Sequence, residues 1–164
     1  MKILITGGKS ALALRLLKAF TQDQVVFADY GEMPSFSSST YSFISLGEKN
    51  VDTIAHTLLN HCLNVAVDFF LPLHSFEIIP VAKAEVLFRE FGIELLLPSL
   101  ASLTPYGTFA PSPSFINWVV FKNGISIYSS LMSNALHELP ETSSLNGVYY
   151  VDGNDVANLK LITI

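Results

Sequence analysis

The residues best placed to do chemistry in this chain lie in its first turn, where Thr6-Gly7-Gly8-Lys9-Ser10 follows a short apolar stretch. Glycines in a tight turn allow a ligand to approach the backbone N–H groups closely, and Lys9 adds a positive charge. A turn of this kind between a strand and a helix is typical of sites that hold a phosphate or another anion. We therefore predict ligand binding by Gly7, Gly8, Lys9 and Ser10.

Gly8-Lys9-Ser10 matches the last three positions of a phosphate-binding P-loop, G-x-x-x-x-G-K-[ST]. The full pattern requires a glycine at position 3, but this residue is Ile3, inside the predicted strand. The loop is therefore too short to wrap around a β-phosphate. The match to the P-loop is a coincidence of register.

The dinucleotide pattern G-x-G-x-x-G also fails, because lysine and leucine stand at positions 9 and 12. The variant T-G-x-x-x-G-x-G of short-chain dehydrogenases fits only if Ala11 and Ala13 replace its last two glycines. Asp29 follows the turn by about 20 residues, where an acid in this kind of fold binds a ribose hydroxyl. The segment Asp152–Ala157 has a faint similarity to the extended members of that group. An NAD(P)-binding protein related to short-chain dehydrogenases and epimerases is therefore an alternative.

A working enzyme of that group also carries a Tyr-x-x-x-Lys pair, in which the lysine lowers the pKa of the tyrosine. None of the tyrosines in this chain has a lysine four positions later. Hydride chemistry of this type therefore has no evident proton donor, and the alternative is a binding domain rather than a catalyst.

Strands and helices are predicted to alternate as far as Pro98. Apolar runs predict strands at Lys2–Ile5, Gln24–Ala28, Tyr41–Leu46, Val65–Leu71 and Ile93–Leu97. Apolar residues at helical spacing predict helices over Ser10–Phe20, over Val51–Cys62 after the N-cap Asn50, and from Pro72 to about Phe91. This alternation predicts an α/β fold with an open, mostly parallel, Rossmann-like sheet and helices on both faces.

The pattern changes after the first 99 residues. Residues 100–114 are rich in proline and serine, which indicates a linker or a surface loop. Asn123-Gly124 between two apolar stretches predicts a hairpin. The remaining predicted elements are a short helix over Ser129–Leu139 and strands at Val148–Val151 and Leu159–Ile164. The aromatic residues of this part of the chain are predicted to be core residues: Tyr106, Trp118 and Tyr149-Tyr150. Residues 115–164 therefore form a smaller, antiparallel-leaning addition that extends or covers the sheet of the same domain.

The composition limits the classes of partner. Half of the residues are apolar and the mean hydropathy is +0.44, yet no run of the length of a membrane span is free of charge and proline. We expect a parallel sheet buried on both faces and an apolar surface for a homodimer or a partner subunit. The net charge of −5 argues against nucleic acid. The single cysteine and the spacing of the histidines predict no metal and a cytoplasmic location.

Residues 1–99 resemble the N-terminal pre-ATP-grasp domain of ATP-grasp ligases, especially the carbamoyl-phosphate-synthase-like members. The motifs that carry the resemblance are, in order, Thr6-Gly7, Ala28-Asp29, Leu71-Pro72, Gly92-Ile93 and Leu97-Pro98-Ser99. The resemblance implies a Rossmann-like domain that helps to form the wall of a carboxylate-binding site. Carried over by position, it places Gly7, Gly8, Lys9, Asp29, Pro72 and His74 at the crevice, with Ser10 and Tyr30 beside them.

Two departures from the family limit what the resemblance implies. The family usually has an acid three or four positions after the Leu-Pro proline, whereas the nearest acid here, Glu77, stands one place later. The residues after Ser99 are too few for the two subdomains that hold ATP. We therefore expect a stand-alone domain without catalysis of its own. It would bind a small anionic ligand or nucleotide (ATP, ADP or NAD(P)), a partner chain, or both; a homodimeric interaction module without a ligand is the other alternative.

Overall fold

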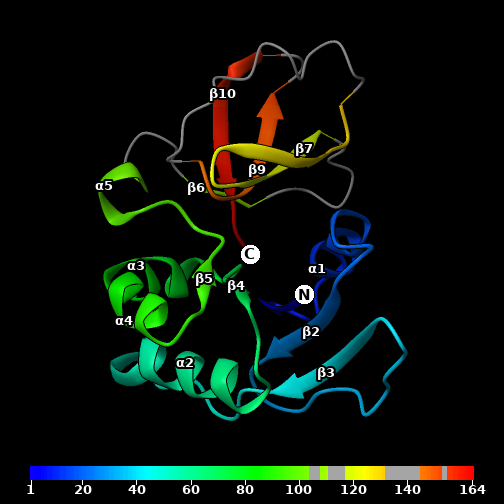
Figure 1. Ribbon diagram of the computed structural model, residues 1–164, viewed down its shortest axis with the longest axis vertical. Coiled ribbons are helices and arrows are strands. Elements are labelled where there is room, and N and C mark those ends of the chain that lie inside the picture. The colour runs from blue at the N-terminus through cyan, green and yellow to red at the C-terminus, as the bar shows by residue number, and fades with distance from the viewer. Residues whose placement is uncertain (104–107, 111–116, 132–144, 153–154) are drawn as a thin grey trace.

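The computed structural model describes residues 1–103, 108–110, 117–131, 145–152 and 155–164 (Figure 1). The first sheet, sheet A, consists of β1 (Lys2–Thr6), β2 (Gln24–Asp29), β3 (Tyr41–Ser45), β4 (Phe69–Leu71) and β5 (Glu94–Leu95). Its strand order is β3-β2-β1-β4-β5, and all neighbouring strands run parallel. The predicted α/β fold with an open, Rossmann-like sheet is confirmed.

The strand order reverses between β1 and β4. From β1 the chain adds β2 and then β3 on one side, and it crosses over to add β4 and β5 on the other side. The loops that leave the carboxyl ends of β1 and β4 therefore diverge. In open α/β sheets a ligand-binding crevice lies at this switch point, because the diverging loops leave room there.

Helices cover both faces of sheet A, which is why neighbouring residues of β1 are both buried. On one face, α2 (Ile54–Asn64), α3 (Ser75–Lys83) and α4 (Glu85–Glu90) pack with Leu4, Ala28 and Phe70. On the other face, α1 (Ala11–Arg15) and the 3-10 helix η1 (Leu16–Ala19) pack with Ile3, Ile5 and Phe27. Figure 1 shows α1 on the opposite side of the sheet from α2, α3 and α4.

The second half of the chain forms a separate sheet, sheet B, in the upper part of Figure 1. Its strands are β6 (Thr108–Phe109), β7 (Trp118–Lys122), β8 (Ile125–Ser129), β9 (Gly147–Asp152) and β10 (Asp155–Ile162), in the order β6-β10-β9-β7-β8. Among the strand pairs that the structure describes in sheet B, only the β6–β10 pair is parallel. Trp118, Val120 and Ile162 share a core with Ile5 and Leu71 on the α1 side of sheet A. Val119, Tyr149 and Leu161 share the other core with Leu4 and Phe70, so sheet B contributes to the cores on both sides of sheet A.

Several boundaries differ from the expectations. The predicted strand at Val65–Leu71 begins only at Phe69, because α2 continues to Asn64 and Ala66 adopts a positive φ of 52° after it. Asn50 accepts the N–H of Asp52 as expected, but it caps a 3-10 helix, η2 (Val51–Thr53), that precedes α2. The range 100–114 contains a short helix, α5 (Leu100–Leu103), as well as β6.

Parts of some predictions lie outside the described residues. The predicted helix over Ser129–Leu139 is wrong at its start, since Ser129 ends β8, and from position 132 it lies outside the described part. Tyr106 and residues 153–154 of the Asp152–Ala157 segment also lie outside it. Trp118 and Tyr149 are core residues, as predicted. Across the described part of the chain, no helix combines the length and the apolar character needed to cross a membrane.

Candidate functional site

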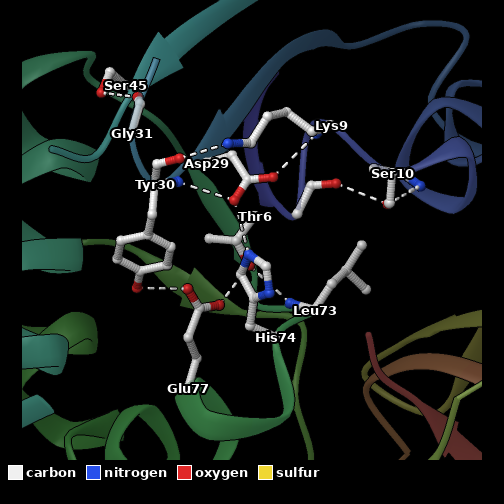
Figure 2. Close-up of polar contacts among 12 residues, drawn as sticks. Thr6, Lys9, Ser10, Asp29, Tyr30, Gly31, Ser45, Leu73, His74 and Glu77 are labelled. Carbon is white, nitrogen blue, oxygen red and sulfur yellow. Dashed lines mark hydrogen bonds and ion pairs between the residues drawn. The ribbon is translucent and has the colours of Figure 1, made fainter. Parts of the chain in front are cut away.

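The carboxyl ends of β1, β2 and β4 bring a group of polar side chains together (Figure 2). This edge cluster consists of Thr6, Lys9, Asp29, Tyr30, His74 and Glu77. Lys9, Asp29, Tyr30 and His74 are among the residues that the sequence predicted for a ligand site. Their contacts follow from the parallel sheet, because the carboxyl ends of its strands share one edge.

Asp29 ends β2 and is only 5% exposed. Its carboxylate accepts the backbone N–H of Lys9 at 3.1 Å and that of Tyr30 at 2.9 Å, and Nε2 of His74 lies 3.0 Å away. Burial alone would raise the pKa of Asp29. The two backbone N–H donors and His74 outweigh burial, so the pKa is lowered and Asp29 keeps its negative charge.

The N–H groups of three residues of the glycine turn have acceptors within the chain. The N–H of Gly8 donates to the carbonyl oxygen of Ala28 at 3.0 Å, that of Lys9 to Asp29, and that of Ser10 to Gly7 at 2.9 Å. Oγ of Ser10 also donates to the Gly7 carbonyl oxygen and accepts the N–H of Ala13, which makes it the N-cap of α1. The turn therefore binds the chain's own carboxylate, and an external anion has to be held by side chains.

Glu77 is the second carboxyl group of the edge cluster, and it is fully buried. Oγ1 of Thr6 donates to its Oε2 at 2.5 Å, and the hydroxyl of Tyr30 donates to its Oε1 at 2.8 Å. The same Thr6 oxygen accepts the N–H of Leu73 at 2.8 Å. This network links the ends of β1, β2 and β4 through one carboxyl group of α3, which fixes the relative positions of their loops.

Burial dominates the electrostatics of this network. It raises the pKa of Glu77, although the hydroxyls of Thr6 and Tyr30 and the charge of His74 oppose the shift. Burial also raises the pKa of Tyr30, and the neighbouring negative charge of Glu77 adds to this effect. Tyr30 therefore remains a hydrogen-bond donor at neutral pH. Two carboxyls at one edge thus have pKa values that are shifted in opposite directions.

Three half-buried rings, those of Tyr30, His74 and Phe76, form an aromatic patch beside the two carboxyls. Their centroids are 5.6 Å apart for Tyr30 and His74, 5.5 Å for Tyr30 and Phe76, and 5.0 Å for His74 and Phe76. Nζ of Lys49 lies 4.2 Å from the centre of the Phe76 ring, and Nζ of Lys9 donates to the carbonyl oxygen of Tyr30 at 2.6 Å. Two exposed ammonium groups therefore flank the patch.

Gly7 lies at the β1 side of the switch point, and Pro72 is buried in the loop after β4. Gly7 has a φ of 70°, and a Cβ at this position would overlap with Cδ1 of Ile164. The N–H of Ile164 donates to the carbonyl oxygen of Leu73 at 2.8 Å, and its own carbonyl oxygen accepts the N–H of Ser75 at 3.0 Å. Residue 164 therefore lies beside the loop after β4 and packs on the glycine turn.

The sequence analysis did not assign Thr6, Glu77, Phe76, Lys49 or Ile164 to the site. A signal for Glu77 was present, because the helical spacing places it on the same apolar face as Ile78 and Val81. A carboxyl group at such a position requires hydrogen-bond donors in the core. Nothing in the local sequence around Ile164 indicates its contact with Gly7.

Among the described residues, histidine, cysteine, aspartate and glutamate side chains form no group of three or more that could hold a metal ion. No protein-family model matches the chain, and no curated protein matches it either. What the observations define is a class of fold, a Rossmann-like α/β protein, together with a polar and aromatic cluster at the carboxyl edge of its parallel sheet.

Proposed function

We propose that this protein is a non-catalytic Rossmann-like binding domain of the pre-ATP-grasp kind, which its first 99 residues resemble. Its ligand is a small organic anion with a planar ring, as in a nucleotide. The observation that carries the proposal is the aromatic patch of Tyr30, His74 and Phe76, which Lys9 and Lys49 flank at the carboxyl edge of sheet A.

The chemistry of the patch favours such a ligand. A planar ring stacks on half-buried aromatic side chains and removes their apolar faces from water. The ammonium groups of Lys9 and Lys49 attract the anionic group of the same ligand. Because the N–H groups of Gly8, Lys9 and Ser10 already have acceptors, side chains rather than the glycine turn would make these contacts.

The two carboxyl groups support binding rather than proton transfer. Asp29 accepts bonds from two backbone N–H groups and contacts His74, and Glu77 accepts bonds from two hydroxyls in a fully buried position. Groups with shifted pKa values often gather at functional sites. Here each carboxyl group accepts hydrogen bonds from donors of the chain itself. These bonds hold the loops that carry the aromatic patch in place.

The test is a thermal-shift and calorimetric titration with AMP, ADP, ATP, NAD+ and NADPH. A ligand at 100 times its Kd stabilises the folded state by about 2.7 kcal/mol. The variant Lys9→Ala should weaken binding by about tenfold, the equivalent of one charge-assisted contact. Lys18→Ala, which removes an exposed lysine from η1, is the matched control and should leave affinity unchanged. The absence of binding by every nucleotide would contradict the proposal.

A second candidate function is self-association, as a homodimeric interaction module. Ile79 of α3 and Leu100 of α5 are 46% and 41% exposed beside a cavity of about 510 Å³, which Ile78, Leu103 and Leu161 also line. Apolar side chains exposed around a hollow favour a protein interface. Light scattering should detect a dimer that Ile79→Lys weakens and that the control Val86→Lys, on α4, does not weaken. A strict monomer at high concentration would contradict this candidate.

A further inference from the structure

We infer that Ile164 is a specificity-determining residue, which covers the glycine turn and restricts the site to ligands with one compact anionic group. A diphosphate, whether inorganic or part of a dinucleotide, is excluded from the glycine turn at the β1–β4 switch point while Ile164 lies there. The inference rests on the proposed function, because it concerns which anions the same edge of sheet A admits.

The position of Ile164 is defined by main-chain and side-chain contacts together. Its backbone pairs with the loop after β4, through the N–H of Ile164 to Leu73 and the N–H of Ser75 to Ile164. Its side chain occupies the space in which a Cβ of residue 7 would lie. The residue therefore bridges the carboxyl ends of β1 and β4, the two strands that flank the switch point.

That space is the one a dinucleotide needs. In Rossmann folds the pyrophosphate lies on the turn after the first strand, and glycine at this turn allows close approach to the backbone. Gly7 lies on the corresponding turn here, and Ile164 packs on it from within the chain. The φ of 70° and the packing of Ile164 are thus two reasons for glycine at position 7 that involve no phosphate.

The part of the edge near β2 is arranged differently. Lys9 and the rings of Tyr30, His74 and Phe76 lie toward β2 and α3, where each of these side chains is at least partly exposed. Lys9 is exposed, so one anionic group can approach its ammonium group from the solvent. A second phosphoryl group would have to extend across the turn, toward Gly7, where the isoleucine lies.

Inorganic phosphate and inorganic pyrophosphate test the inference, because they share their chemistry and differ in length. We expect Ile164→Ala to raise the affinity for pyrophosphate by about tenfold and to leave the affinity for phosphate within about twofold of the original value. Ile127→Ala is the matched control, since it shortens a partly exposed isoleucine on β8. Isothermal titration calorimetry on the full chain measures the dissociation constants for phosphate and for pyrophosphate.

A double-mutant cycle tests the packing of Ile164 without a ligand. Gly7→Ala should destabilise the original protein more than it destabilises the Ile164→Ala protein, because only the first contains the overlapping side chain. The strain of alanine at a φ of 70° is common to both and cancels in the comparison. Urea denaturation of the original protein, the two single variants and the double variant gives the coupling free energy between residues 7 and 164.

The outcomes separate this inference from the proposed function. The inference is overturned if the original protein binds pyrophosphate as well as Ile164→Ala does, if that variant gains no affinity for it, or if the cycle shows no coupling. The proposed function fails if the original protein binds no nucleotide. A gain of pyrophosphate binding by Ile164→Ala alone would support the exclusion by Ile164 and contradict the proposed ligand.

Discussion

Asp29 and Glu77 lie at the same edge of the same sheet, but their surroundings act on them in opposite ways. Asp29 accepts bonds from the rigid backbone N–H groups of the loops after β1 and β2, and its pKa is lowered. Glu77 accepts bonds from the hydroxyls of Thr6 and Tyr30 in a fully buried position, and its pKa is raised. The comparison teaches that two backbone N–H donors and His74 keep the buried carboxylate of Asp29 charged, whereas burial outweighs the two hydroxyl donors of Glu77.

The largest expected effect is that of Glu77→Ala. The substitution leaves the hydroxyls of Thr6 and Tyr30 without their acceptor inside the protein, and it should lower the free energy of unfolding by about 3 kcal/mol. Urea denaturation at neutral pH measures the loss. Glu90→Ala, at an exposed position on α4, is the control. Equal losses in the two variants would show that the Glu77 network does not hold the strand ends together.

Asp29→Asn should have a smaller effect, of about 1–2 kcal/mol, because the amide keeps the shape of the side chain but weakens its charge-assisted hydrogen bonds. The same denaturation experiment measures it, with Asp52→Asn at an exposed position of η2 as the control. If Asp29→Asn lowers the free energy of unfolding more than Glu77→Ala does, then Asp29 contributes more to the stability of this edge than Glu77, the reverse of the expected order.

Tyr30→Phe removes one of the two hydroxyls that donate to Glu77 and leaves the donor from Thr6 in place. The expected loss is about 1 kcal/mol, typical of a single hydrogen bond. Thermal or urea denaturation measures it, and Tyr41→Phe on β3 serves as the control for the loss of a tyrosine hydroxyl. No loss at Tyr30 would indicate that Thr6 alone satisfies Glu77.

The smallest effect is a pH dependence, and it has opposite signs for the two carboxyls. The folded state lowers the pKa of Asp29 below 3.8, so its contribution to stability is present above that value and is lost as the pH falls through the folded-state pKa. The folded state raises the pKa of Glu77 above 4.5, so its contribution is present below that value and is lost as the pH rises through the folded-state pKa.

Glu77→Gln therefore should gain stability relative to the original protein as the pH rises above 4.5, since glutamine has no proton to lose. Asp29→Asn should lose stability relative to the original protein as the pH rises through the folded-state pKa of Asp29 and past 3.8. Urea midpoints measured from acidic to neutral pH test both slopes. If the stability of both variants relative to the original protein changed with pH in the same direction, the pKa values of Asp29 and Glu77 would not be shifted in opposite directions.

Much of sheet A and part of the edge cluster could be predicted from the sequence. The apolar runs at β1 and β2 are long enough to identify buried strands, and the helical pattern between them requires a parallel crossover. Once the strands are parallel, Lys9, Asp29 and His74 must lie at one edge, because each stands at or just after the carboxyl end of a strand. This part of the site depends only on local pattern and on the geometry of parallel sheets.

Other features depend on contacts between distant residues. The sequence marked Glu77 only as an acid displaced from a family pattern, although its place on an apolar helix face indicated burial. Sheet B was expected to extend or cover sheet A, and only the tertiary structure shows that it is a separate sheet, with Val120 in the core on one side of sheet A and Val119 in the core on the other. No short-range pattern selects between these two arrangements, because both bury the same apolar strands.

The sequence by itself determined the parallel sheet and the residues at its carboxyl edge, since hydrophobic period and turn chemistry are local properties. Only the tertiary structure decided what the edge can bind. It directs the N–H of Lys9 to Asp29, it buries Glu77 under the hydroxyls of Thr6 and Tyr30, and it packs Ile164 on Gly7. The physical reason is that a turn open to a ligand and a turn filled by the chain's own side chains have the same local sequence.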